Sequence, residues 1–166
     1  MKTRYFALFA LLAVLATVAT LSISSFSMAE DAKKEEKKEA AFCPVGGIGH
    51  DINKEVSVDF AGGKVYFCCD KCPAPFEKDT AKFTANAHHQ MVATKQLKQT
   101  ACPLTGKKVN PDMTVEVAGV EVGLCCGGCK GKINKIEKDE EKIEVLFKDT
   151  SKGFKLAKKE SASEKK

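Results

Sequence analysis

The chain has 166 residues, eight cysteines and no tryptophan, and its 27 basic and 22 acidic residues give a formal net charge of +5. Its lysines are interspersed with glutamates and form no basic stripe between aromatic residues, which excludes the usual kind of nucleic-acid-binding surface. No Ser/His/Asp set, pair of catalytic carboxylates or phosphate-cradling loop can be recognised, so we do not expect an enzyme.

The N-terminal segment, residues 1–29, has the three-part layout of a secretory signal peptide. Lys2 and Arg4 precede an apolar run over residues 5–21, and small residues end the segment at 27–29. The run is shorter than the roughly 20 residues of a membrane span, so we expect cleavage after residue 29 and not an uncleaved membrane anchor. Cleavage leaves 25 basic and 22 acidic residues, a net charge of +3. The expected location is secreted or periplasmic, with no membrane contact beyond the signal segment.

Two segments of mixed charge flank the central part of the chain. Residues 30–41 are predicted to be a charged linker and residues 151–166 a disordered basic tail, because both contain few side chains that can bury surface. The roughly 110 residues between them suffice for two very small domains, which usually need disulfides or a metal for stability. We place these domains at residues 42–99 and 100–150.

The second half of the chain repeats the first, and all eight cysteines fall into register, four in each repeat. The sequence "CPVGG" from Cys43 corresponds to "CPLTG" from Cys102, and "VYFCCDKC" corresponds to "VGLCCGGC". The clustered cysteines are offset by 57 positions, from Cys68 to Cys125, and the leading cysteines by 59. Such a repeat predicts two domains of the same architecture.

The first repeat is predicted to be a β-hairpin followed by a helix. Residues 56–60 alternate apolar and polar side chains, residues 61–63 supply turn chemistry, and residues 65–67 resume an extended run. After the cysteine cluster, Pro73 and Pro75 suit the start of a helix.

The second repeat predicts the same order of elements. Residues 115–122 form a hairpin around a turn at residues 118–119, and apolar side chains follow at helical spacing. These are Ile133, Ile136, Ile143, Leu146 and Phe147. The predicted fold class is α+β, with two small tandem repeats, each a β-hairpin, a cysteine knuckle and a helix in a treble-clef or zinc-ribbon-like arrangement.

Each repeat has four cysteines that can ligate a soft or borderline cation. One lies in a Pro/Gly-rich loop, and three lie where a strand passes into a helix, a turn at which side chains three or four positions apart converge. We expect one zinc or copper(I) ion in each repeat. The predicted ligands are Cys43, Cys68, Cys69 and Cys72 in the first repeat and Cys102, Cys125, Cys126 and Cys129 in the second.

The adjacent cysteines leave the number of ligands open. Neighbouring side chains in an extended strand point to opposite faces, so Cys69 and Cys126 reach the same ion as their neighbours only if the chain turns. Four thiolates would form the closed tetrahedral set typical of Zn(II). Three would favour Cu(I) and leave Cys69 and Cys126 free or taking part in ligand exchange.

A disulfide framework is the competing interpretation, because an even number of cysteines in a small exported chain usually forms disulfides. The chain would then be a disulfide-stapled protein-interaction module of the cell envelope. The two Cys-x-x-Cys spacings also suit a thiol-disulfide oxidoreductase, but repeats of about 50 residues lack room for the βαβ context of such an enzyme. The clustered spacing, seen twice, favours metal. We expect His50, His88 and His89, which have no counterpart in the second repeat, to be surface or capping residues.

These motifs resemble the TRASH and YHS group of small heavy-metal-binding domains, in the exported bacterial type. Cys43, residues 65–72 and Phe76 match the group's leading cysteine, its Cys-x-x-x-Cys after an aromatic-rich strand, and its helical aromatic anchor. Residues 102–129 match the spacing, with Gly123 and Leu124 in place of the aromatic pair. Here the leading cysteine precedes a proline, whereas YHS members often have Pro-Val-Cys-Gly, and each repeat has one extra cysteine.

The resemblance implies a metal buffer, carrier or sensor, with copper and zinc as the usual metals. Such a protein would have the metal ion as its first partner and a metal-handling or envelope protein as its second.

Overall fold

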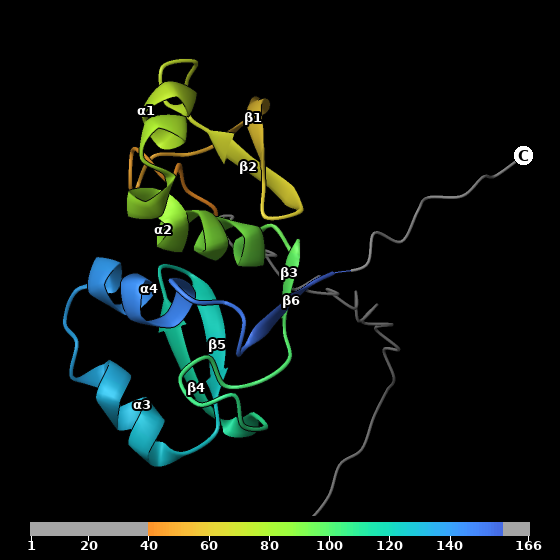
Figure 1. Cartoon of the computed structure of the whole chain (residues 1–166). Coiled ribbons are helices and arrows are strands. Elements are labelled where there is room, and N and C mark those ends of the chain that lie inside the picture. Colours follow the sequence, from red (N-terminus) through yellow and green to blue (C-terminus); the bar gives the residue numbers. More distant parts are fainter. Residues whose placement is uncertain (1–39, 158–166) are drawn as a thin grey trace, which may run out of the picture. The chain divides into compact units, whose positions relative to one another are not determined.

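The computed structural model describes residues 40–157 (Figure 1). The predicted signal peptide, the predicted linker up to residue 39, and residues 158–166 lie outside this range. Among the described residues, no helix combines the length and apolar character that crossing a membrane requires.

The first repeat consists of an antiparallel hairpin and two helices. Strand β1 (Asn53–Phe60) pairs with β2 (Gly63–Phe67), which confirms the predicted hairpin. Helix α1 (Pro73–Lys78) begins at the predicted proline, and α2 (Thr80–Ala93) follows after Asp79, whose side chain caps its first turn.

The second repeat has the same order of elements. Strand β4 (Asn110–Val117) pairs with β5 (Val120–Leu124), and helices α3 (Gly127–Asn134) and α4 (Asp139–Phe147) follow. Both hairpins join an eight-residue strand to a five-residue strand. Both also carry the same irregularity in strand register, between the first and the fifth residue of the longer strand. The duplication seen in the sequence therefore extends to details of backbone geometry.

A third ladder joins the two repeats and differs from the sequence-based expectation. Strand β3 (Leu97–Gln99) pairs antiparallel with β6 (Phe154–Leu156), so residues 151–157 are not part of a disordered tail as predicted. The physical reason is Phe154, which is buried in the core and packs on the ring of Phe147 at 5.4 Å between centroids. One apolar side chain therefore holds an otherwise charged segment against the domain.

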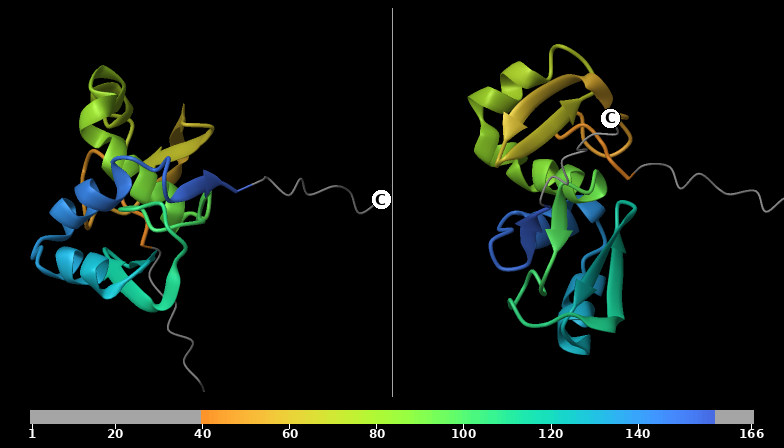
Figure 2. Two further views of the ribbon diagram at one scale, coloured as in Figure 1. Left: turned by 60° about the horizontal axis from the view of Figure 1, so that its bottom comes forward. Right: turned by 90° about the vertical axis from the view of Figure 1, so that its right-hand side faces the viewer.

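Helix α2 lies between the first hairpin and the helices and strands of the second repeat (Figure 2). His88 and His89 on this helix are buried, so they are not surface residues as one alternative of the prediction had it. Nδ1 of His88 hydrogen-bonds to the Phe147 carbonyl at 2.8 Å, and Nε2 of His89 to the Val117 carbonyl at 3.0 Å. The two imidazoles therefore tie the first repeat to α4 and β4 of the second.

The core passes through both repeats without interruption. Residues from both hairpins, from α2 and from α4 belong to one cluster of buried side chains. Its largest fully buried members are Phe67, Phe76, Phe147, Met91, Leu124, Ile133, Ile143 and Leu146.

Candidate metal centres

The first site is a group of three thiols from two segments of the first repeat. The Sγ atoms of Cys43, Cys68 and Cys72 all lie within 4.8 Å of one another, and those of Cys68 and Cys72 are 3.5 Å apart. Two thiolates on one tetrahedral zinc ion lie about 3.8 Å apart, given a metal–sulfur distance of about 2.3 Å. The triad is therefore already close to the spacing that a shared ion requires. All eight cysteine thiols of the chain are free.

A tight loop over residues 43–50 positions the leading cysteine. The backbone N–H of Cys43 donates to the His50 carbonyl at 2.8 Å, and the N–H of Gly47 donates to the Cys43 carbonyl at 2.9 Å. Gly47 has a φ of +82°, a conformation that favours glycine. The N–H of Gly46 points at the Cys43 sulfur at 3.4 Å. The loop therefore buries this thiol and offers a hydrogen bond to its sulfur.

The other thiols lie on the first knuckle, which we define as residues 68–72 between β2 and α1. The N–H of Cys72 donates to the carbonyl of Cys69 at 3.2 Å, so the chain turns within the knuckle. Phe67 before it and Phe76 after it pack edge to face at 5.3 Å and anchor both ends. The turn places Sγ of Cys69 3.5 Å from that of Cys72 and 3.9 Å from that of Cys68. Cys69 remains exposed, outside the triad.

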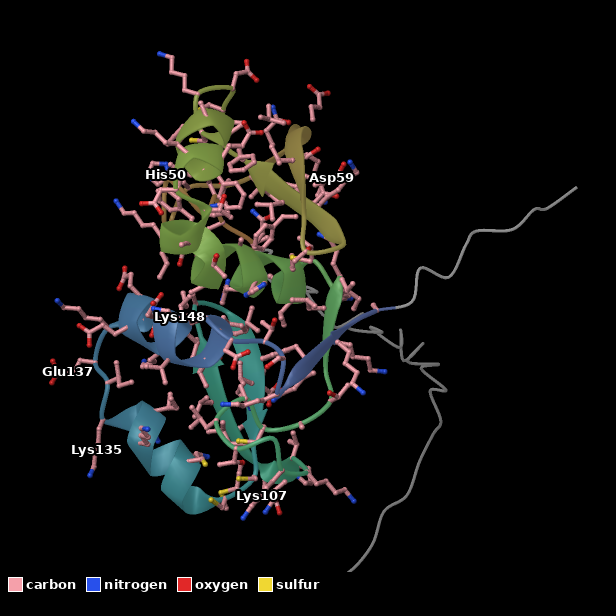
Figure 3. All side chains as sticks on the ribbon, viewed as in Figure 1. His50, Asp59, Lys107, Lys135, Glu137 and Lys148 are labelled. Carbon is pink, nitrogen blue, oxygen red and sulfur yellow. The ribbon has the colours of Figure 1, made fainter. Side chains whose placement is uncertain are left out.

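The second site repeats this construction. The Sγ atoms of Cys102, Cys125 and Cys129 all lie within 4.8 Å of one another, with 3.7 Å between Cys125 and Cys129. The N–H of Cys102 donates to the Lys107 carbonyl at 2.8 Å, which closes the second loop. Figure 3 shows sulfur atoms near the labelled Lys107. Cys126 is exposed, with its Sγ 3.8 Å from that of Cys125.

The two sites differ in what surrounds them. In the second site the hydroxyl of Thr105 lies 3.3 Å from the sulfur of Cys125. The second knuckle, residues 125–129, has Gly127 and Gly128 where the first has Asp70 and Lys71. Cys129 is half-buried whereas its counterpart Cys72 is buried, so the second site is more exposed than the first.

The leading thiols have lowered pKa values. Burial raises the pKa of Cys43, but hydrogen bonds from the backbone N–H groups of Gly46, Cys68 and Val45 outweigh it and leave the pKa below its ordinary value. Burial also raises the pKa of Cys102, but hydrogen bonds from the Thr105 side chain and nearby backbone amides bring it down to about 7. The leading cysteine of each repeat is therefore prepared to bind as a thiolate.

The last cysteine of each knuckle has the opposite property. Burial raises the pKa of Cys72 well above its ordinary value, and neighbouring thiols add to the effect. The same causes raise the pKa of Cys129 to about 12. In a metal-free site these two thiols hold their protons, which a bound cation would displace.

Two glutamines that the sequence reasoning missed brace the sites. Gln90 is fully buried; its Oε1 accepts from the N–H of Tyr66 at 2.7 Å, and its Nε2 donates to the carbonyls of Tyr66 at 2.7 Å and Phe42 at 2.9 Å. Tyr66 lies on β2 near the knuckle, and Phe42 directly precedes Cys43. The side chain therefore fixes the leading loop against the strand that ends in the knuckle.

Gln99 does the same in the second repeat. Its Oε1 accepts from the N–H of Gly123 at 2.8 Å, and its Nε2 donates to the carbonyls of Gly123 at 2.6 Å and Ala101 at 3.0 Å. Gly123 and Ala101 are the counterparts of Tyr66 and Phe42. The two glutamines come from a helix and a strand at non-equivalent positions, so the repeat pattern contains no signal that would have found them.

The structure brings together six of the eight predicted ligands as two triads and leaves Cys69 and Cys126 beside them. Neither triad contains a histidine. His50 is exposed, and it is the carbonyl of its backbone that contributes to the first loop.

No protein-family model, no curated protein and no solved structure matches the chain.

Proposed function

We propose that this chain is an exported metal-binding protein that holds one zinc or copper(I) ion in each repeat. The observation that carries the proposal is the doubled triad: two groups of three thiols, each within 4.8 Å, built by equivalent segments of a duplicated fold. The protein would act as a metal buffer, carrier or sensor, as the resemblance to TRASH and YHS domains implies. In this proposal each hairpin, knuckle and helix is a treble-clef-like metal unit. The resident ligands are Cys43, Cys68 and Cys72 in the first repeat and Cys102, Cys125 and Cys129 in the second.

The convergence of three sulfur atoms favours metal over a disulfide framework. A disulfide joins two sulfur atoms, whereas Cys43, Cys68 and Cys72 are mutual neighbours and surround one point. Soft thiolates brought together from two chain segments are the donor set that Zn(II) and Cu(I) prefer. Three thiolates suit trigonal Cu(I), while Zn(II) would take a fourth ligand.

Native mass spectrometry of the exported chain, before and after acid denaturation, tests the proposal. We expect a mass excess of two ions that disappears on denaturation and leaves eight free thiols. Cys43→Ser and Cys102→Ser should each lower the capacity by one ion, because each removes the buried ligand of one site. A chain that carries no metal and is short of two hydrogens for each pair of cysteines would instead support the disulfide-stapled module.

A further inference from the structure

The first knuckle contains a second triangle of sulfur atoms that shares an edge with the triad of Cys43, Cys68 and Cys72. Sγ of Cys69 lies 3.5 Å from that of Cys72 and 3.9 Å from that of Cys68, and the shared edge between Cys68 and Cys72 measures 3.5 Å. Cys43, which is fully buried, completes the inner triangle, whereas Cys69, which is exposed, completes the outer one. An ion can therefore pass between an inner and an outer three-sulfur position while two of its ligands stay the same.

The second knuckle also places its exposed cysteine, Cys126, beside a pair of triad thiols, and it is more open. Its shared edge, between Cys125 and Cys129, measures 3.7 Å, and Sγ of Cys126 lies 3.8 Å from that of Cys125. A Cβ atom on Gly127 would meet nothing within 4 Å, and one on Gly128 would meet only the sulfur of Cys126 at 3.8 Å. The backbone of another molecule can thus approach Cys126 closely.

We propose that Cys69 and Cys126 are exchange thiols, through which each ion passes to an acceptor protein that presents a pair of cysteines. This inference rests on the proposed metal-binding function and adds the route and the chemistry of the partner. The extra cysteine of each repeat would then bind the ion only during transfer, unlike a resident ligand or a structural thiol.

The transfer is a series of ligand exchanges without change of oxidation state. In the first repeat, the exposed thiol of Cys69 releases its proton to solvent and binds the ion as the bond to Sγ of Cys43 breaks, while Cys68 and Cys72 remain bound. The Cys43 thiolate that is left behind accepts a hydrogen bond from the backbone N–H of Gly46. The two acceptor thiols then bind as thiolates, and the protons that they release are taken up by the cysteines of the chain as they leave the ion.

A dithiol acceptor follows from the chemistry of the outer position. Each step replaces one metal–thiolate bond by another, so the ion is never without soft donors and the barrier stays low. Dissociation into water would require the loss of three such bonds from a partly buried site. An exposed sulfur beside the shared edge therefore changes the rate of release much more than the amount of metal bound.

The test measures metal transfer from the full exported chain to a metal-free synthetic Cys-x-x-Cys peptide, with Zn(II) and in parallel with Cu(I). The chain with both Cys69→Ser and Cys126→Ser is compared with the unchanged chain. Asp70→Ser is the matched control, because it alters an exposed residue of the same knuckle without removing a sulfur. Native mass spectrometry gives the number of bound ions, and stopped-flow mixing gives the transfer rate.

We expect the double variant to retain two ions and to transfer them at least about tenfold more slowly. A tenfold slower transfer corresponds to an activation free energy higher by about 1.4 kcal/mol. The Asp70→Ser chain should match the unchanged chain in both measurements. An unaltered transfer rate in the double variant would overturn the inference. Loss of bound ions would also overturn it, since Cys69 and Cys126 would then be resident ligands. An unchanged chain that binds no ion would overturn the proposed function itself, so the two failures are distinguishable.

Discussion

Replacing Gln90 by leucine tests whether one buried amide holds the loop of Cys43, residues 43–50, in place. Leucine has a similar volume but cannot replace the hydrogen bonds that Gln90 makes with the N–H and carbonyl of Tyr66 and with the carbonyl of Phe42. Three backbone groups would lose their partner beside a side chain that is fully buried. Each unsatisfied buried group costs about 1–3 kcal/mol, and relaxation relieves part of the sum, so we expect a loss of about 3–5 kcal/mol. That is a large share of the roughly 5–15 kcal/mol by which a domain is stable.

Gln96→Leu is the matched control. Gln96 makes the same pair of contacts with Lys64, accepting from its N–H at 2.6 Å and donating to its carbonyl at 2.7 Å, but at the exposed end of the same strand. Water can replace these bonds, so we expect a loss of about 1 kcal/mol or less.

Urea unfolding followed by circular dichroism gives the comparison. It is run at one fixed concentration of free metal, because a bound ion adds to apparent stability. Gln90→Leu should also weaken the first site and leave the second unchanged, which metal titration of each site by mass spectrometry would show. Equal losses of stability for Gln90→Leu and Gln96→Leu would refute the reasoning.

Three further predictions concern the metal, the buried imidazole and the last strand. Chelation should abolish the helix and strand signal of at least one repeat, since ligation supplies folding free energy in units this small; a full circular dichroism signal without metal would contradict this. Burial lowers the pKa of His89, whose Nδ1 lies buried without a hydrogen-bond partner. As the pH falls, the imidazole is therefore protonated at a higher pH in the unfolded chain than in the folded one. Stability should therefore be complete above the ordinary value of 6.5 and fall as the pH drops below it, with a steeper slope than in His89→Gln; equal slopes would count against a buried neutral imidazole. Ending the chain after residue 150 removes Phe154 and should cost about 3–5 kcal/mol in urea unfolding, whereas ending it after residue 157 should cost almost nothing; similar stability of the two truncations would show that β6 contributes little.

The sequence predicted the structural elements that depend on interactions between residues close together in the chain. Alternating side chains over residues 56–60 gave the first hairpin, and the proline at position 73 gave the start of α1. The spacing of the cysteines predicted the six thiols that form the two triads. These features depend on neighbours in the sequence, so the sequence contains their signal.

The remaining features depend on contacts between distant segments. Phe154 is one apolar residue in a charged stretch, and only the apolar surface of the second repeat explains its burial. His88 and His89 are polar by composition, and their burial becomes visible only when the carbonyls of Phe147 and Val117 are placed beside them. The position of Cys69 was left open because it depends on a backbone turn inside the knuckle. The spacing of apolar residues along the sequence gives no signal for any of these contacts.

The ladder between β3 and β6 has a consequence for the order of folding. Leu97 pairs with Leu156, so the ladder closes a loop that contains the second hairpin and both of its helices. Closing a loop of that size is favourable only once its contents are compact, which makes this pairing a late step. A chain that emerges N-terminus first must expose its residues up to 156 before β3 finds its partner. The two copies are thus bound into a single folding event, and a gene that lost one copy would leave the other with an unpaired strand.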